Sequence, residues 1–149
     1  MYTYEFPRPA VSVDIVLLGG PREERSVLLV RRAFEPFAGW WALPGGFVDE
    51  GERLVDAARR ELAEETCVAF AGELEQVGAW GDPGRDPRGW TVSVVFRGDV
   101  GTELVEVCGG DDAAEAMWHR LGNDGTVPVP LAFDHADILA AVRSSSMNG

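Results

Sequence analysis

The stretch that most constrains this chain runs from Gly46 to Val68 and combines a glycine turn with a helix rich in carboxylates. With about 100° of rotation per residue, Glu61 and Glu65 fall in the same sector as the apolar residues Leu54 and Ala58. A solvated helix turns its glutamates away from its apolar stripe. Two inward carboxylates four residues apart repel each other unless a cation joins them. Their hard oxygens suit Mg²⁺ or Mn²⁺, although ordinary i,i+4 ion pairs on a solvated helix are the simpler alternative.

The same stretch resembles the Nudix box, Gly-x5-Glu-x7-Arg-Glu-U-x-Glu-Glu-x-Gly-U, in which U is bulky and apolar. Gly46, Glu52 and the run Arg60–Val68 match its six specified glycine and polar positions other than the last glycine. Such a match arises by chance on the order of once per million starting positions. Cys67 stands where the family has glycine. That position follows the helix end, where a left-handed conformation is common and a non-glycine residue costs about 1 kcal/mol.

The resemblance implies hydrolysis of a nucleoside diphosphate derivative with Mg²⁺ (or Mn²⁺) as cofactor. It implies that Glu61 and Glu65 bind the metal together with the carbonyl of Gly45, the residue just before the box. Glu64 lies at the edge of the inward sector and is expected to bridge a second metal or to accept a proton from water. Arg60 is expected to orient these carboxylates. Glu61, Glu64 and Arg60 are therefore candidate catalytic residues.

Many Nudix proteins draw a further acid from a loop beyond the central strands. The acidic run here offers Asp111, Asp112 and Glu115, and Asp112 is the first candidate because it precedes an expected strand. A solvated acidic loop is the alternative. A base that activates water must come within about 3 Å of it. His135 is expected to be a packed, hydrogen-bonded residue rather than a catalytic one.

Four side chains are expected to bind substrate. Arg85 and Arg88 offer charge-assisted hydrogen bonds to ribose or phosphate. Trp40 and Trp41 are adjacent, so on a strand they face opposite ways; one is expected in the core, and Trp40 is the candidate for stacking a base. Arg31 and Arg32 end a predicted strand whose end approaches the substrate in a Nudix-like sheet, and Arg31 is the candidate for binding phosphate. The alternative for each arginine is a surface ion pair.

Three features resemble the ADP-ribose pyrophosphatase subgroup. Pro83 lies 15 residues beyond Val68, the run at 81–96 reads GDPGRDPRGWTVSVVF, and the run at 131–139 reads LAFDHADIL. The leading hypothesis is therefore hydrolysis of ADP-ribose to AMP and ribose 5-phosphate. The alternatives are another substrate, such as an oxidised nucleoside triphosphate, NADH or a sugar nucleotide, or a non-catalytic sensor that binds ADP-ribose. The resembling sensors carry a basic C-terminal module, which this sequence is not expected to have.

Composition narrows the class of protein. The 149 residues suit one domain at 1–149, and 46% hydrophobic residues indicate a globular chain. No apolar run approaches the ~20 residues of a membrane span, and no signal peptide is evident. Two cysteines without metal spacing are expected to be reduced thiols in a cytoplasmic protein. The net charge of −12 argues against nucleic-acid binding. The resemblance implies a homodimer.

The order of predicted elements indicates the fold. Strands are expected near 10–18, 26–32, 74–80 and 90–97, with a weaker one at 102–107 and another at 116–119. Helices are expected at 53–66 and 133–143. Residues 1–10 form an N-terminal extension, read as an edge strand, a dimer contact or a loose tail, and 144–149 a frayed tail. This order predicts an α+β fold, an α/β/α sandwich with a mixed β-sheet between helices, in agreement with the Nudix fold.

Overall fold

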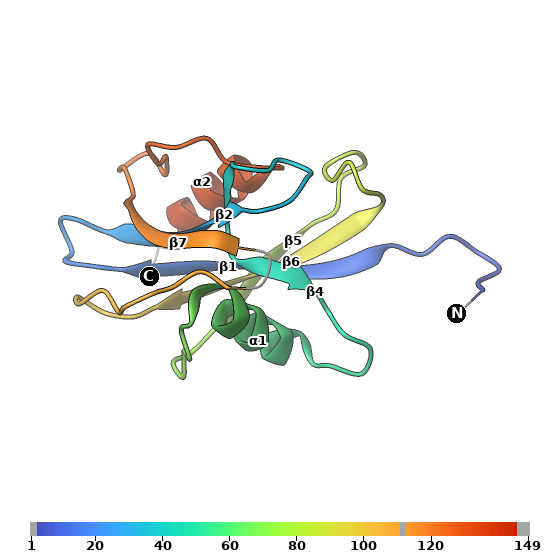
Figure 1. Ribbon diagram of the computed structural model, residues 1–149, viewed down its shortest axis with the longest axis horizontal. Coiled ribbons are helices and arrows are strands. Elements are labelled where there is room, and N and C mark those ends of the chain that lie inside the picture. Colours follow the sequence, from blue (N-terminus) through green and yellow to red (C-terminus); the bar gives the residue numbers. More distant parts are fainter. Residues whose placement is uncertain (1–2, 111–112, 146–149) are drawn as a thin grey trace.

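The computed structural model describes residues 3–110 and 113–145, and shows a mixed sheet of seven strands between two helices (Figure 1). The strands are β1 (Ala10–Gly19), β2 (Ser26–Arg32), β3 (Trp41–Ala42), β4 (Gly45–Phe47), β5 (Glu75–Trp80), β6 (Thr91–Asp99) and β7 (Ala113–Arg120), and the helices are α1 (Leu54–Thr66) and α2 (His135–Ser145). Helix α1 covers one face of the sheet and α2 the other. The α/β/α sandwich predicted from the sequence is confirmed. Neither described helix is long and apolar enough to cross a membrane.

Strand β1 organises the sheet because it has neighbours on both edges. It runs parallel to β6 from Ala10 to Leu18. Its other edge is shared, since β4 pairs with residues 12–14 and β2 pairs only with residues 18–19, both antiparallel. Strand β2 also pairs with β7 and with the short β3. The functional cavity lies where β1, β2, β3 and β4 meet.

Alternation along β1 supplies two separate cores. Val13, Ile15 and Leu17 pack on the α1 side together with Leu62 and its neighbours. The intervening residues Val16 and Leu18 pack on the α2 side, where Ile138, Leu139 and Val142 are buried. Since successive side chains of a strand point to opposite faces, this strand is apolar on both faces over most of its length, as its near-continuous apolar sequence predicts.

The structure corrects several predicted boundaries. The prediction of a weak strand at 102–107 is wrong, because the described residues between Asp99, the end of β6, and Ala113, the start of β7, form no strand. Strand β7 begins at Ala113, before the predicted residue 116. Helix α2 begins at His135 because Phe133 has a left-handed φ of 55°, and it continues through residue 145, into the predicted tail. Residues 3–9 form no strand. Residues 1–2 and 146–149 lie outside the described part of the chain.

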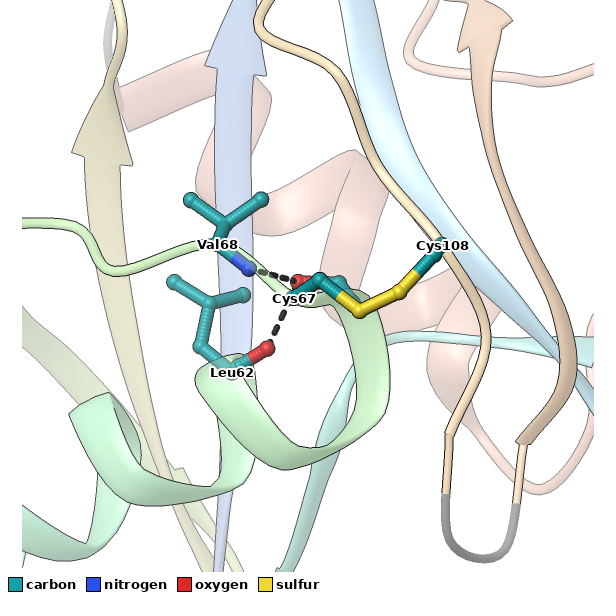
Figure 2. Close-up of a disulfide and its surroundings, with 5 residues drawn as sticks. Leu62, Cys67, Val68 and Cys108 are labelled. Carbon is teal, nitrogen blue, oxygen red and sulfur yellow. Dashed lines mark hydrogen bonds between the residues drawn. A yellow bond between two sulfur atoms is a disulfide. The ribbon is translucent and has the colours of Figure 1, made fainter.

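The prediction of two reduced thiols is also wrong. Cys67 and Cys108 form a disulfide that joins the end of α1 to the segment before β7 (Figure 2). Their Cα atoms are 5.5 Å apart, within the usual range for a disulfide. This pairing could not be inferred from the sequence, because 41 residues separate the two positions and only the fold brings them together. Cys67 keeps the left-handed conformation expected of the family glycine, with φ of 65°.

Candidate active site

A cavity of about 480 Å³ opens beside β4 and receives side chains from both faces of the sheet. Helix α1 contributes Arg60, Glu61 and Glu65, and the connection before β6 contributes Arg85 and Arg88. The cavity thus brings together most of the residues that the sequence analysis singled out. Its lining also includes Ser12, Asp14, Val30, Arg32, Phe34, Glu35, Ala42, Leu43, Gly45, Gly46, Phe47, Asp49, Asp86, Phe133 and His135.

Two helix carboxylates converge on the backbone of Gly45 and Gly46. Glu65 is buried, with 8% of its surface exposed, and its Oε1 accepts a hydrogen bond of 2.8 Å from the Gly45 N–H. A Cβ added to Gly46 would lie 2.5 Å from the carboxyl carbon of Glu61. A Cβ on Gly45 would collide with the carbonyl oxygen of Val13. Glycine is therefore required at both positions, because the turn lies in close contact with β1 and with the helix carboxylates.

Arg60 holds several carboxylates in place. Its Nε donates to Glu52 at 2.7 Å, and its Nη1 donates to Glu61 at 2.7 Å and to Glu64 at 3.2 Å. Its Nη2 also donates to the carbonyl of Phe47. The hydrogen bond with Glu52 raises the pKa of Arg60 and lowers the pKa of Glu52. Arg60 therefore pairs with three acidic residues of the box, and its i,i+4 pair with Glu64 coexists with the inward placement of Glu65.

The donors in this region fit a divalent cation in chemical type. Glu61 and Glu65 present hard carboxylate oxygens one helical turn apart beside the Gly45–Gly46 backbone, and Mg²⁺ and Mn²⁺ prefer such oxygens. Among the described residues, no group of three or more His, Cys, Asp or Glu side chains forms a metal cluster. A cation here would therefore use backbone and substrate oxygens beside the two carboxylates, which is common for Mg²⁺.

The two arginines before β6 differ in how far their side chains are exposed. The side chain of Arg85 is 6% exposed and makes a bidentate ion pair with the Asp134 carboxylate. Its Nε and Nη2 donate hydrogen bonds of 2.8 and 2.7 Å. Burial opposes the charge of Arg85, but the hydrogen bond with Asp134 raises its pKa overall. The side chain of Arg88 is 43% exposed, and its guanidinium lies 5.1 Å from the ring of Phe47 and 5.2 Å from that of Phe133. Arg88 is thus the more accessible cation of the two.

Asp86 positions Arg88 at the rim of the cavity. The buried Asp86 carboxylate accepts hydrogen bonds from the Arg88 backbone N–H at 2.9 Å and from its Nη2 at 2.8 Å. Burial raises the pKa of Asp86, but these hydrogen bonds outweigh burial and lower it overall. The pairing of Asp86 with a neighbouring arginine, considered from the sequence, is confirmed.

Two charged cavity residues, Arg32 and Asp14, were not among the candidate site residues predicted from the sequence. Arg32 lies with its guanidinium 4.9 Å from the Phe133 ring, on a segment where pairing with β7 shifts register after Arg31. Val30 and Arg32 both line the cavity and Arg31 does not, as alternation along a strand predicts. Asp14 is a buried acid that accepts a hydrogen bond from Ser93. A single charged residue within the apolar run AVSVDIVLL was the available signal for Asp14.

Three predicted site residues do not line the cavity. Arg31 pairs with Glu115 at 3.4 Å on the surface. Trp40 is exposed and makes an edge contact with Phe37 at 5.6 Å between ring centroids. Glu64 is exposed beside Arg60. The roles of these residues stay predictions, and Asp112 lies outside the described residues.

His135 is a packing residue in this geometry. It is 4% exposed, and its Nδ1 accepts a hydrogen bond of 3.0 Å from the Leu43 N–H. Its Nε2 lies 3.7 Å from Asp14 Oδ1. Burial lowers the pKa of His135 despite the nearby acid. The histidine therefore fixes the start of α2 against the segment that leads into β4.

Comparison with known proteins agrees with this arrangement. The NUDIX domain family matches residues 8–142. The ADP-ribose pyrophosphatase of Methanocaldococcus jannaschii is 43% identical over 132 residues, covering 88% of this chain and 71% of that protein. The ADPR responsive transcriptional repressor NtrR of Acinetobacter baylyi is 33% identical over 137 residues, covering 91% of this chain and 53% of the repressor. The chain thus spans about half of the repressor's length.

A solved structure extends the comparison to three dimensions. The NUDIX domain of Shewanella oneidensis NrtR, complexed with ADP ribose, superposes with a TM-score of 0.81 at 32% identity, covering 97% of this chain and 91% of that one. The family match covers most of the chain, and the Glu61–Glu65–Gly45 arrangement follows its sequence motif. The chain therefore belongs to the Nudix family and is a Nudix pyrophosphohydrolase.

Proposed function

We propose that this protein hydrolyses the pyrophosphate bond of ADP-ribose, with Mg²⁺ or Mn²⁺, to give AMP and ribose 5-phosphate. The observation that carries the proposal is one cavity lined both by carboxylates of α1 and by the accessible Arg88. A pyrophosphate needs both, because its charge must be neutralised and its orientation held. The 43% identity to a protein described as an ADP-ribose pyrophosphatase supports this choice of substrate.

We assign separate roles to the residues that would bind the metal, orient its ligands, bind the substrate and accept a proton. Glu61, Glu65 and the Gly45 carbonyl would hold the metal, which supplies positive charge for the phosphates and lowers the pKa of water. Arg60 holds Glu61 in its orientation through the 2.7 Å ion pair. Arg88 binds phosphate or ribose oxygens by charge-assisted hydrogen bonds. Glu64 and Asp112 are our candidates for accepting the proton of the attacking water.

The aromatic rings near Arg88 are suited to stacking on the nucleobase of a bound nucleotide. Phe47 and Phe133 flank its guanidinium, and Phe34 lines the same cavity with 62% of its surface exposed. Exposed aromatic faces stack on nucleobases. We retain Arg85 and Arg31 as weaker proposals for substrate contacts, since each has a carboxylate partner. Trp40 likewise remains a proposal for base stacking.

A substrate panel tests the proposal. The full chain is incubated with Mg²⁺ and, separately, ADP-ribose, NADH, a sugar nucleotide and an oxidised nucleoside triphosphate, and the nucleotide products are quantified. We expect ADP-ribose to have the highest kcat/KM, with AMP as product. If ADP-ribose were the poorest substrate, the choice would be wrong, although the Nudix box could still be catalytic.

A second candidate function is suggested by the similarity to NtrR and NrtR. These are described as an ADPR responsive repressor and as a NUDIX domain complexed with ADP ribose. A sensor would bind ADP-ribose without turnover and would shift DNA in a gel. We propose instead that the chain binds no nucleic acid, because its net charge is −12. Retarded DNA with no AMP release would favour the sensor.

We also propose a homodimer of one domain, residues 1–149, in the cytoplasm. The exposed Tyr4 and Phe6 of the N-terminal extension support an interface there. Light scattering at several concentrations tests the dimer, and a monomer at all of them would refute it. Cell fractionation tests the location. A disulfide in a cytoplasmic protein is usually redox-active rather than structural.

A further inference from the structure

The disulfide lies at the end of the catalytic helix, directly after its last acidic residues. Cys67 is the C-cap of α1, and its N–H donates to the Ala63 carbonyl. The backbone N–H of Cys108 donates to the Thr66 carbonyl at 3.0 Å. Figure 2 shows the sulfur bridge crossing from the helix end to the neighbouring segment. The cross-link thus holds that segment two to three residues from Glu64 and Glu65.

The segment on the other side of the bridge is held by backbone hydrogen bonds and by Val107, which packs against the core on the α1 side. Residues 100–110 form no helix or strand. The Trp118 indole donates to the Val105 carbonyl at 2.9 Å, and Gly20 donates to Gly101 at 2.9 Å. Gly110 lies so close to the helix that an added Cβ would be 2.5 Å from the Glu64 carbonyl oxygen. The disulfide adds a covalent constraint at the end of this segment that meets α1.

The bridge is accessible to other thiols. Both cysteines are exposed. A thiolate must approach a disulfide sulfur directly to exchange with it, and exposed disulfides are the ones that react. The left-handed position of Cys67 suits glycine best, so a cysteine there is explained by its bond with Cys108 rather than by the backbone.

We propose that the Cys67–Cys108 disulfide is a reversible redox site that reacts with dithiols and fastens the segment 101–110 to the end of the catalytic helix. One thiolate of the dithiol attacks a sulfur of the bridge, so that the S–S bond breaks and a mixed disulfide forms. The second thiolate of the dithiol then attacks the dithiol's own sulfur in the mixed disulfide and displaces the remaining cysteine as a thiolate, which takes up a proton. The dithiol leaves oxidised, and the protein has gained two electrons and two protons as two thiols.

Reduction releases the segment without changing the two cores. Neither Cys67 nor Cys108 belongs to a buried hydrophobic cluster. The Thr66 hydroxyl still donates to the Leu62 carbonyl at 2.6 Å, so the helix end keeps this bond. We therefore expect local loosening of residues 101–110 and of the last turn of α1, rather than unfolding. Loss of the cross-link also lowers Tm by about 10 °C, because the unfolded chain becomes less constrained.

The test compares redox states of the full chain without substrate. Oxidised protein is titrated with dithiothreitol, free thiols are counted by maleimide labelling and intact mass, and amide hydrogen exchange is followed at 101–110. We expect reversible two-thiol reduction in native buffer and at least a tenfold rise in exchange in this segment. Cys108→Ser and Cys67→Gly are the matched controls, since each removes the bridge and Cys67→Gly keeps a residue suited to the left-handed cap.

Defined outcomes separate the possibilities. In both variants, the rate of amide hydrogen exchange at 101–110 should equal that of the reduced wild type and should not change when dithiothreitol is added. Two free thiols in air-purified protein that diamide does not oxidise would overturn the proposal, as would a bridge that reacts only in denaturant. Equal exchange at 101–110 in both redox states would overturn the fastening role. These readouts need no substrate, so they stand apart from any failure of the proposed ADP-ribose activity.

Activity provides one further measurement, which rests on the proposed function. We expect reduction to lower kcat for ADP-ribose at least threefold, because the end of the catalytic helix loosens beside Glu64 and Glu65. The two cysteine variants should match the reduced protein in kcat and stay insensitive to dithiothreitol. An unchanged kcat in the reduced wild type would overturn a regulatory role of the bridge.

Discussion

Replacing Glu65 with glutamine separates the catalytic role of this side chain from its structural one. Glu65 is buried, and its Oε1 accepts the 2.8 Å hydrogen bond from the Gly45 N–H. Glutamine keeps that acceptor but removes the negative charge. We expect the free energy of unfolding to change by less than about 1 kcal/mol. Loss of a charged metal ligand should cost about 3 kcal/mol in the transition state, a fall of about 100-fold in AMP release.

Glu65→Ala is the informative comparison. Alanine removes the acceptor as well as the charge, so the part-buried Gly45 N–H loses its partner. An unsatisfied donor of this kind costs about 1–3 kcal/mol. Glu65→Ala should therefore equal Glu65→Gln in lost activity and be about 2 kcal/mol less stable.

The assays are AMP release from ADP-ribose with Mg²⁺ and urea unfolding of the same preparations. Glu73→Gln, at an exposed position, removes one charge and should change neither quantity. The reasoning is refuted if Glu65→Gln keeps more than a tenth of the wild-type rate in a preparation that hydrolyses ADP-ribose. It is also refuted if the glutamine and alanine variants lose stability equally.

Three other perturbations follow from the geometry. Arg85→Ala leaves Asp134 without its bidentate partner and should lower the free energy of unfolding by about 3 kcal/mol in urea. Burial places the folded-state pKa of His135 below its unfolded value near 6.5. Its contribution to stability is therefore complete above pH ~6.5 and is lost as the pH falls below it, at up to about 1.4 kcal/mol per pH unit; His135→Asn should flatten urea-measured stability between pH 7.5 and 5.5. Gly46→Ala pushes a methyl group to 2.5 Å from the Glu61 carboxyl carbon and should weaken Mn²⁺ binding at least tenfold in a spin-resonance titration.

Each of these has a result that would contradict it. An Arg85→Ala variant as stable as the wild type would show that its ion pair with Asp134 contributes nothing. A pH profile of stability that His135→Asn leaves unchanged would mean that this histidine is not buried as a neutral group. Unaltered Mn²⁺ affinity in Gly46→Ala would remove Glu61 from the proposed metal ligands.

Local sequence determined the elements that depend on short-range patterns. The inward glutamates predicted helix 53–66, and the structure has Leu54–Thr66 with Arg53 as N-cap. The strand predicted at 26–32 has the same bounds in the structure. The sandwich followed from the order of elements. Such features depend on periodicity within one segment, which the sequence displays directly.

Candidate metal ligands and the arginines before β6 were also accessible from spacing and resemblance. Spacing could not distinguish Arg85 from Arg88. The fold buries Arg85 against Asp134, 49 residues away, and leaves Arg88 exposed beside two aromatic rings. Burial and pairing at this separation depend on how α2 packs.

Only the tertiary structure decided which side chains line the cavity and which distant residues contact each other. It placed Arg32 in the cavity and paired Arg31 with Glu115 on the surface. It joined Cys67 to Cys108 across 41 residues. The sequence by itself determined which chemical groups each segment carries and how each segment is shaped. Which of these groups meet is decided by packing between segments distant in the chain, because side chains interact over a few ångströms in space and not along the sequence.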